Sequence, residues 1–101
     1  MSMRKLSFLL TFLLFVGFSA SAQMQITGQV TNAQSGDPIP GVSIVVKGQT
    51  TIGTTTDMDG NYSLQVPSDA QTLVFSFVGM QTREVPIRGR TTIDVAMDPA
   101  V

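Results

Sequence analysis

The chain has 101 residues, no histidine and no cysteine, and its six basic and seven acidic residues give a formal net charge of −1. The missing residue types exclude Ser-His-Asp and Cys-His catalytic groups, disulfide bonds, and the ligands on which nearly all zinc sites depend. Because no basic cluster offers several converging Lys or Arg side chains, we expect no nucleic-acid partner.

The first 22 residues have the pattern of a secretory signal peptide. Arg4 and Lys5 precede an uncharged apolar run over residues 6–18, and the small residues 20–22 (ASA) offer a cleavage site before Gln23. The run is shorter than the ~20 residues that a membrane-spanning helix needs, which disfavours the alternative of a retained anchor. No cysteine follows the run for lipid attachment. We therefore predict that residues 1–22 are removed and that residues 23–101 form one exported domain.

Apolar residues recur at every second position along residues 23–101, with clusters of Gly, Pro, Asp and Asn between the runs. This period is typical of strands and not of helices. The pattern predicts strands at residues 24–31, 42–47, 50–56, 61–66, 71–78, 81–87 and 91–97, with a structured loop or edge segment at 32–41. About seven short strands separated by turn signals indicate an all-β fold, an antiparallel β-sandwich.

The same alternation predicts which side chains face the core. One apolar set points inward; its members are Ile26, Val30, Ile44, Val46, Tyr62, Leu64, Phe75, Phe77, Ile93 and Val95. Three valines, Val45, Val74 and Val78, fall on the opposite faces. Ordinary β-propensity explains outward valines, but if their strands are neighbours they form one apolar stripe on which a partner could dock.

Residues 54–64 (TTTDMDGNYSL) place Asp57 and Asp59 two residues apart between two predicted strands. A turn in a hairpin connection favours Asp and Gly at such a place. A calcium loop of the EF-hand type would need glycine where Tyr62 stands and glutamate where Ser68 stands. An acid/base pair would need one carboxyl in an environment that raises its pKa, whereas a hairpin tip is usually solvated. We predict a turn, with a weak calcium site as the alternative.

Other candidate groups for catalysis are also poorly placed. Ser43 and Lys47 lie on one predicted strand ~13 Å apart, too far for a Ser-Lys dyad. The glycines follow no G-x-G-x-x-G or Walker spacing that would cradle a phosphate. The sequence thus predicts a protein that is not an enzyme, with no catalytic, cofactor-binding or metal-binding residues and no cofactor.

Four segments in series resemble a known family. Residues 26–30 (ITGQV), 36–48 (GDPIPGVSIVVKG), 56–64 (TDMDGNYSL) and 73–80 (LVFSFVGM) are similar to the carboxypeptidase-regulatory-like, transthyretin-like β-sandwich. A signal peptide that leads directly into this domain resembles the N-terminal extension of SusC/RagA-type TonB-dependent outer-membrane transporters.

This resemblance implies a periplasmic accessory domain that precedes a TonB box, a plug and a large β-barrel, which imports glycans or peptides with a surface lipoprotein lid. The expected partners are the plug and barrel, with the energy-transducing proteins and the lid as further candidates, and the outer membrane is reached only through the barrel. The family continues where this chain ends, so we expect a truncated gene product or an isolated module. The alternative is an interaction or adhesion module of another secreted or surface protein.

Overall fold

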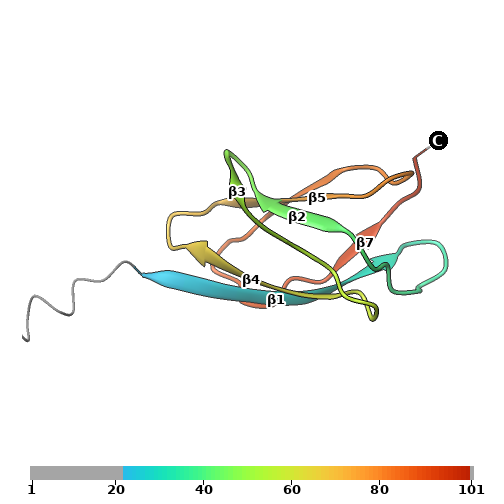
Figure 1. Cartoon of the computed structure of the whole chain (residues 1–101), viewed down its shortest axis with the longest axis horizontal. Coiled ribbons are helices and arrows are strands. Elements are labelled where there is room, and N and C mark those ends of the chain that lie inside the picture. The colour runs from blue at the N-terminus through green and yellow to red at the C-terminus, as the bar shows by residue number, and fades with distance from the viewer. Residues whose placement is uncertain (1–21, 101) are drawn as a thin grey trace, which may run out of the picture.

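Two β-sheets face each other in the computed structural model, which describes residues 22–100 (Figure 1). The predicted signal peptide lies outside the described residues except for Ala22. The strands are β1 (Gln23–Asn32), β2 (Ser43–Val46), β3 (Gln49–Thr55), β4 (Asn61–Pro67), β5 (Thr72–Ser76), β6 (Arg83–Pro86) and β7 (Val95–Met97). The described residues contain no helix, so the predicted all-β sandwich of seven strands is confirmed.

The strand order is β4-β1-β7 in one sheet and β3-β2-β5-β6 in the other. Neighbouring strands are antiparallel with one exception, the parallel pairing of β1 with β7, in which Val30 lies opposite Val95. The predicted antiparallel sandwich therefore has one exception, at this pair. The physical reason is the connectivity: between β1 and β7 the chain builds the whole four-stranded sheet and returns in the same direction.

The core fills the space between the two sheets, and it consists of the apolar side chains that alternate inward along the strands. Its fully buried members include Ile26, Val30, Ile44, Leu73 and Phe75. Of the predicted core residues, all are buried except Phe77. The period of two in the sequence thus identifies the core face correctly wherever the strand is regular.

Phe77 was expected in the core, and this prediction is wrong because β5 ends one residue earlier, at Ser76. The Phe77 side chain is 38% exposed and that of Val78 is 91% exposed. Gly79 has a φ of 79°, and the Met80 N–H donates to the Phe77 carbonyl at 3.1 Å. This turn takes the chain out of the sheet before the inward position is reached.

The expected hairpin between the third and fourth strands is also wrong, since β3 and β4 belong to different sheets. Thr56 is buried at the point where the chain leaves β3. Its hydroxyl donates to the Ile39 carbonyl at 2.7 Å and accepts from the Val42 N–H at 2.9 Å. These bonds tie the end of β3 to the loop that precedes β2. After Thr56 the chain crosses to the opposite sheet.

Candidate functional site

The turn that carries the two carboxylates is held together by Asp57. One oxygen of its carboxylate, Oδ1, accepts from the backbone N–H groups of Asp59 at 2.9 Å and Asn61 at 3.0 Å. The Asp57 N–H donates to the Asn61 carbonyl at 2.9 Å. Both carboxylates are exposed. The predicted turn is confirmed, and Asp57 serves as its internal hydrogen-bond acceptor.

Gly60 places this turn against the neighbouring strand. It has a φ of 75°, and its carbonyl accepts from the Val30 N–H at 2.8 Å. A β-carbon at this position would lie 2.6 Å from the Val30 carbonyl oxygen and 2.9 Å from Pro38 Cβ. Only glycine fits so close an approach at this backbone angle, so the motif is explained by packing.

Within residues 22–100, no three or more Asp, Glu, His or Cys residues lie together in an arrangement that could hold a metal ion. The same residues include no helix long and apolar enough to cross a membrane. That Asp57 and Asp59 form no metal site stays a prediction, and a weak calcium site is the alternative that titration can test.

Tyr62 is the buried titratable group of the sandwich. Its hydroxyl donates to the Ile93 carbonyl at 2.6 Å. Burial and the charge of Asp94 raise the pKa of Tyr62 to about 12, with Arg90 acting in the opposite direction. A hydroxyl with so high a pKa stays protonated at neutral pH and acts as a hydrogen-bond donor, which fits a structural role.

Gly28 makes room for this contact. A β-carbon on Gly28 would lie 1.9 Å from the Ile93 carbonyl oxygen and 2.9 Å from the Tyr62 ring. The segment around Ile93 therefore runs directly across Gly28. There the Ile93 N–H donates to the Thr27 carbonyl at 2.9 Å. A glycine at a core-facing strand position is the sequence signal that indicates such an approach.

The outward side of the four-stranded sheet, here called the outer face, is small, neutral and partly apolar. At its centre Val45 of β2 lies directly opposite Val74 of β5, and both are half-buried. The strand residues that share this face include Ser43, Val45, Gly53, Thr55, Thr72, Val74, Ser76, Glu84 and Pro86. Lys47 and Glu84 pair with each other at 3.0 Å. The strands of Val45 and Val74 are therefore neighbours, which is the condition under which these two valines form one apolar stripe.

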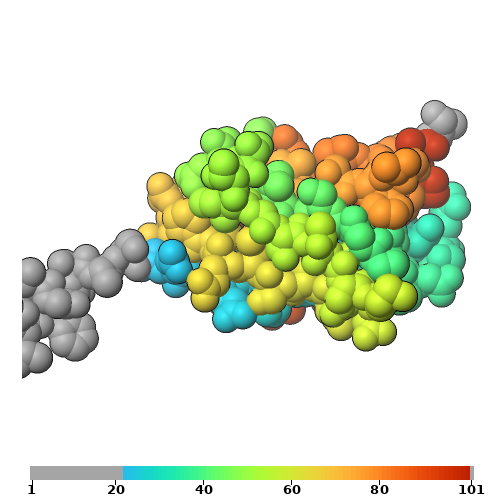
Figure 2. Space-filling view, in the orientation of Figure 1, coloured from blue at the N-terminus to red at the C-terminus, as the bar shows by residue number. Residues whose placement is uncertain are grey.

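Val78, the third valine of the predicted stripe, lies beyond the end of β5. A shallow hollow lined by Gly41, Ser43, Ser76, Phe77 and Val78 joins it to the outer face. In Figure 2 the orange atoms of the segment that includes this turn lie beside the red atoms near the C-terminus, where the Ala100 N–H donates to the Gly79 carbonyl at 2.8 Å. The apolar surface thus extends from the sheet to the exposed side chains of Phe77 and Val78.

Sequence reasoning missed the buried Thr56, because the threonines of residues 50–56 carry no signal that separates it from its exposed neighbours. Sequence reasoning assigned Ser43 and Lys47 no joint catalytic role. In the structure the Lys47 side chain pairs with Glu84. The geometry therefore brings together no predicted catalytic pair. It leaves a neutral, partly apolar sheet face as the feature best suited to a function.

Comparison with known proteins gives a consistent result. The model of the CarboxypepD_reg-like domain family matches residues 26–100. The chain is 41% identical over 92 residues to TonB-dependent receptor P3 of Formosa agariphila. The aligned segment covers 90% of this chain and 9% of the receptor. It is also 33% identical over 88 residues to TonB-dependent receptor SusC of Bacteroides thetaiotaomicron. That alignment covers 87% of this chain and 9% of the receptor. The chain thus spans about a tenth of the length of these relatives.

Proposed function

This chain belongs to the CarboxypepD_reg-like domain family, and from that premise we propose that it acts as a non-catalytic accessory domain of a TonB-dependent outer-membrane transporter. Its place would be the periplasmic face of the outer membrane in a Gram-negative bacterium. There it would adjoin the plug and barrel that the longer receptors contain. The transported nutrient would be a glycan or a peptide, and its contacts would lie outside this domain.

One observation carries the proposal: the similarity to TonB-dependent receptors extends over most of the chain, at 41% identity for the receptor P3 and 33% for SusC. The chemistry of the chain supports a role without catalysis, because the sequence has neither histidine nor cysteine. The carboxylate of Asp57 is engaged in its own turn. Docking is the activity that this set of residues can perform.

We further propose that docking uses the outer face around Val45 and Val74. The two valines give it an apolar centre, and Gly53 beside Val45 adds no side chain that would cover it. Lys47 and Glu84 neutralise each other at 3.0 Å. A partner could therefore approach this face without having to desolvate an unpaired charge.

The reading frame after the codon for Val101 provides the first test. A plug and a barrel encoded in frame would support the accessory role, whereas a different extracellular architecture would favour an interaction or adhesion module of another surface protein. In a receptor that carries the domain, in-frame removal of residues 23–101 should leave the barrel in the outer membrane and impair nutrient uptake. Unimpaired uptake at a normal receptor level would contradict the proposal.

A further inference from the structure

Strand β3 is an open edge of the four-stranded sheet. Its pairing with β2 is irregular between Gln49 and Gly53, but it lacks the charged side chains and the proline that protect many such edges. Its residues, Gln49–Thr55, include no charged side chain and no proline. At the other edge of the same sheet, β6 (Arg83–Pro86) carries two charges and a proline. Charged residues and proline prevent pairing with another strand, so their absence leaves β3 able to accept one.

The register identifies which backbone groups of β3 are unpaired. The Thr56 N–H donates to the Val42 carbonyl, and Ile44 lies opposite Thr54. Because hydrogen-bonded pairs alternate along an antiparallel ladder, the N–H and C=O groups of Gly53 and Thr55 point away from β2. In the described region no other strand follows β3 in the sheet order, so these groups face outward from the edge.

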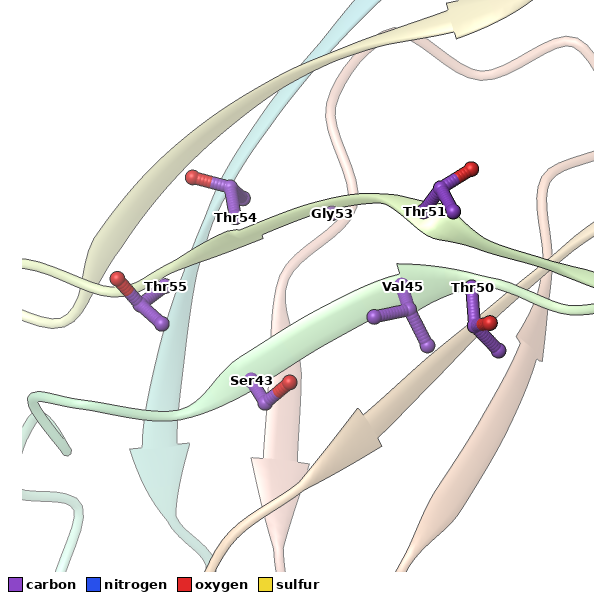
Figure 3. A pocket seen from close by; sticks show the side chains of 7 residues that line it. All are labelled: Ser43, Val45, Thr50, Thr51, Gly53, Thr54 and Thr55. Atoms are coloured by element: carbon purple, nitrogen blue, oxygen red, sulfur yellow. The ribbon is translucent and has the colours of Figure 1, made fainter.

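A shallow hollow lies on each side of β3. The first is on the outer face, where Val45, Thr51 and Gly53 contribute to its lining (Figure 3). The second lies toward β4, where Asp57 and Tyr62 contribute to its lining. A strand added to β3 would direct alternate side chains to these two sides, which is how peptide-binding sheet edges combine backbone pairing with side-chain selection.

The charges near β3 indicate what kind of strand would fit. Asp57 lines the second hollow, and the exposed Asp59 follows it in the same turn. The nearest basic residue in the sequence, Lys47, is paired with Glu84 at 3.0 Å. A segment with acidic side chains would be repelled here, whereas a neutral or basic segment would be accepted.

We propose that β3 accepts an extended, non-acidic peptide segment of a partner protein as a fifth strand of the four-stranded sheet. This inference rests on the proposed function, since it names the chemistry of the partner that a docking domain would engage. The backbone of Gly53 and Thr55 supplies the hydrogen bonds. The two hollows receive the alternate side chains.

The test uses the ¹⁵N-labelled protein recovered after export and a capped synthetic peptide of alternating threonine and valine with one lysine at its end. At millimolar peptide, the amide resonances of Gly53 and Thr55 should shift, and their hydrogen exchange should slow. A peptide methylated at its central backbone nitrogens should bind at least about tenfold more weakly, because it cannot donate to the edge. Replacement of its lysine by glutamate should weaken binding about two- to fivefold.

Two protein variants isolate the backbone contribution. Thr55→Pro removes the outward N–H without removing a bond to β2, whereas Thr55→Val keeps that N–H and serves as the matched control. Peptide binding should be lost in the first variant and retained in the second, with circular dichroism showing both folded. If Thr55→Pro does not fold, the comparison of plain and methylated peptides still decides the question.

The proposal would be overturned by no binding at millimolar peptide, by equal binding of the methylated peptide, or by resonance shifts confined to residues away from β3. Self-association through β3 that excludes the peptide would also overturn it and assign the edge to a second copy. These measurements do not involve uptake. Their failure would leave the accessory role in the transporter standing, while unimpaired uptake without the domain would contradict that role and leave the peptide result unchanged.

Discussion

The ring of Tyr62 meets the ring of Phe75 edge to face, with centroids 5.6 Å apart and an angle of 77° between the planes. Tyr62 belongs to β4 and Phe75 to β5, so this contact joins the two sheets. Aromatic pairs in this arrangement add to the stabilisation that burial alone provides. The pair therefore stabilises the packing of the two sheets against each other.

Phe75→Ala should lower the free energy of unfolding by roughly 3 to 5 kcal/mol, because it removes a fully buried aromatic side chain and leaves a cavity. Phe77→Ala is the matched control, since the same atoms are removed from a side chain that is 38% exposed. Urea unfolding of both variants measures the difference. A Phe75→Ala midpoint equal to that of the wild type would show that the core has been assigned wrongly.

Tyr62→Phe should cost about 1 to 2 kcal/mol, because the Ile93 carbonyl loses its buried donor. The pH dependence follows from the pKa of Tyr62, raised from 10.0 to about 12. In the unfolded chain the phenol ionises near its ordinary pKa, while in the folded chain it stays protonated. The contribution of Tyr62 to stability is thus complete below about pH 10 and is lost as the pH rises toward about 12.

The sequence contains a single tyrosine, so ultraviolet titration of the folded protein reports Tyr62 alone. Stability measured across the same pH range should fall more steeply for the wild type than for Tyr62→Phe. Ionisation of the folded protein near pH 10, or parallel stability curves for the two proteins, would disprove the buried hydrogen bond.

Gly60→Ala should be more destabilising than Gly79→Ala. Both glycines have a positive φ, 75° and 79° respectively, so both variants incur backbone strain of about 1 to 2 kcal/mol. Only at Gly60 would the new β-carbon meet neighbouring atoms, at 2.6 Å from the Val30 carbonyl oxygen. We expect the extra cost to exceed about 1 kcal/mol. Equal unfolding midpoints would mean that the turn does not pack on β1 as described.

Asp57→Ala should destabilise the protein by about 1 to 2 kcal/mol, because two backbone N–H groups lose their acceptor. Asp59→Ala should change stability by less than about 0.5 kcal/mol, as expected for an exposed substitution. Calorimetric titration with calcium should reveal no site tighter than about millimolar. Micromolar calcium affinity that disappears in Asp57→Asn would instead establish a metal site in this turn.

The sequence predicts the strands and the core well because both depend on local alternation, as Ile26, Ile44 and Leu64 illustrate. It fails where a long-range contact overrides that pattern. The alternation continues through Phe77, yet the turn at Gly79 and the bridge of Met80 to Pro99 redirect the chain.

Features of the candidate site divide in the same way. The outward direction of Val45 and Val74 follows from strand period, but their direct opposition depends on which strands become neighbours. The open edge at β3 depends on the sheet order, and the local sequence does not determine it. Similarly, the crossing from β3 to β4 is fixed by the hydrogen bonds of Thr56 with residues 14 and 17 positions away.

Nutrient uptake by a receptor that carries Val45→Asp together with Val74→Asp tests the docking function most directly. The matched control is Gln25→Asp together with Gln65→Asp, a directly opposed and exposed pair on β1 and β4 of the other sheet. Receptor level in the outer membrane and folding of the exported domain are measured in parallel. We predict that growth on the transported nutrient is impaired by the valine variant and unaffected by the control. Normal growth with a folded, normally abundant valine variant would contradict the assignment of the outer face as the docking surface.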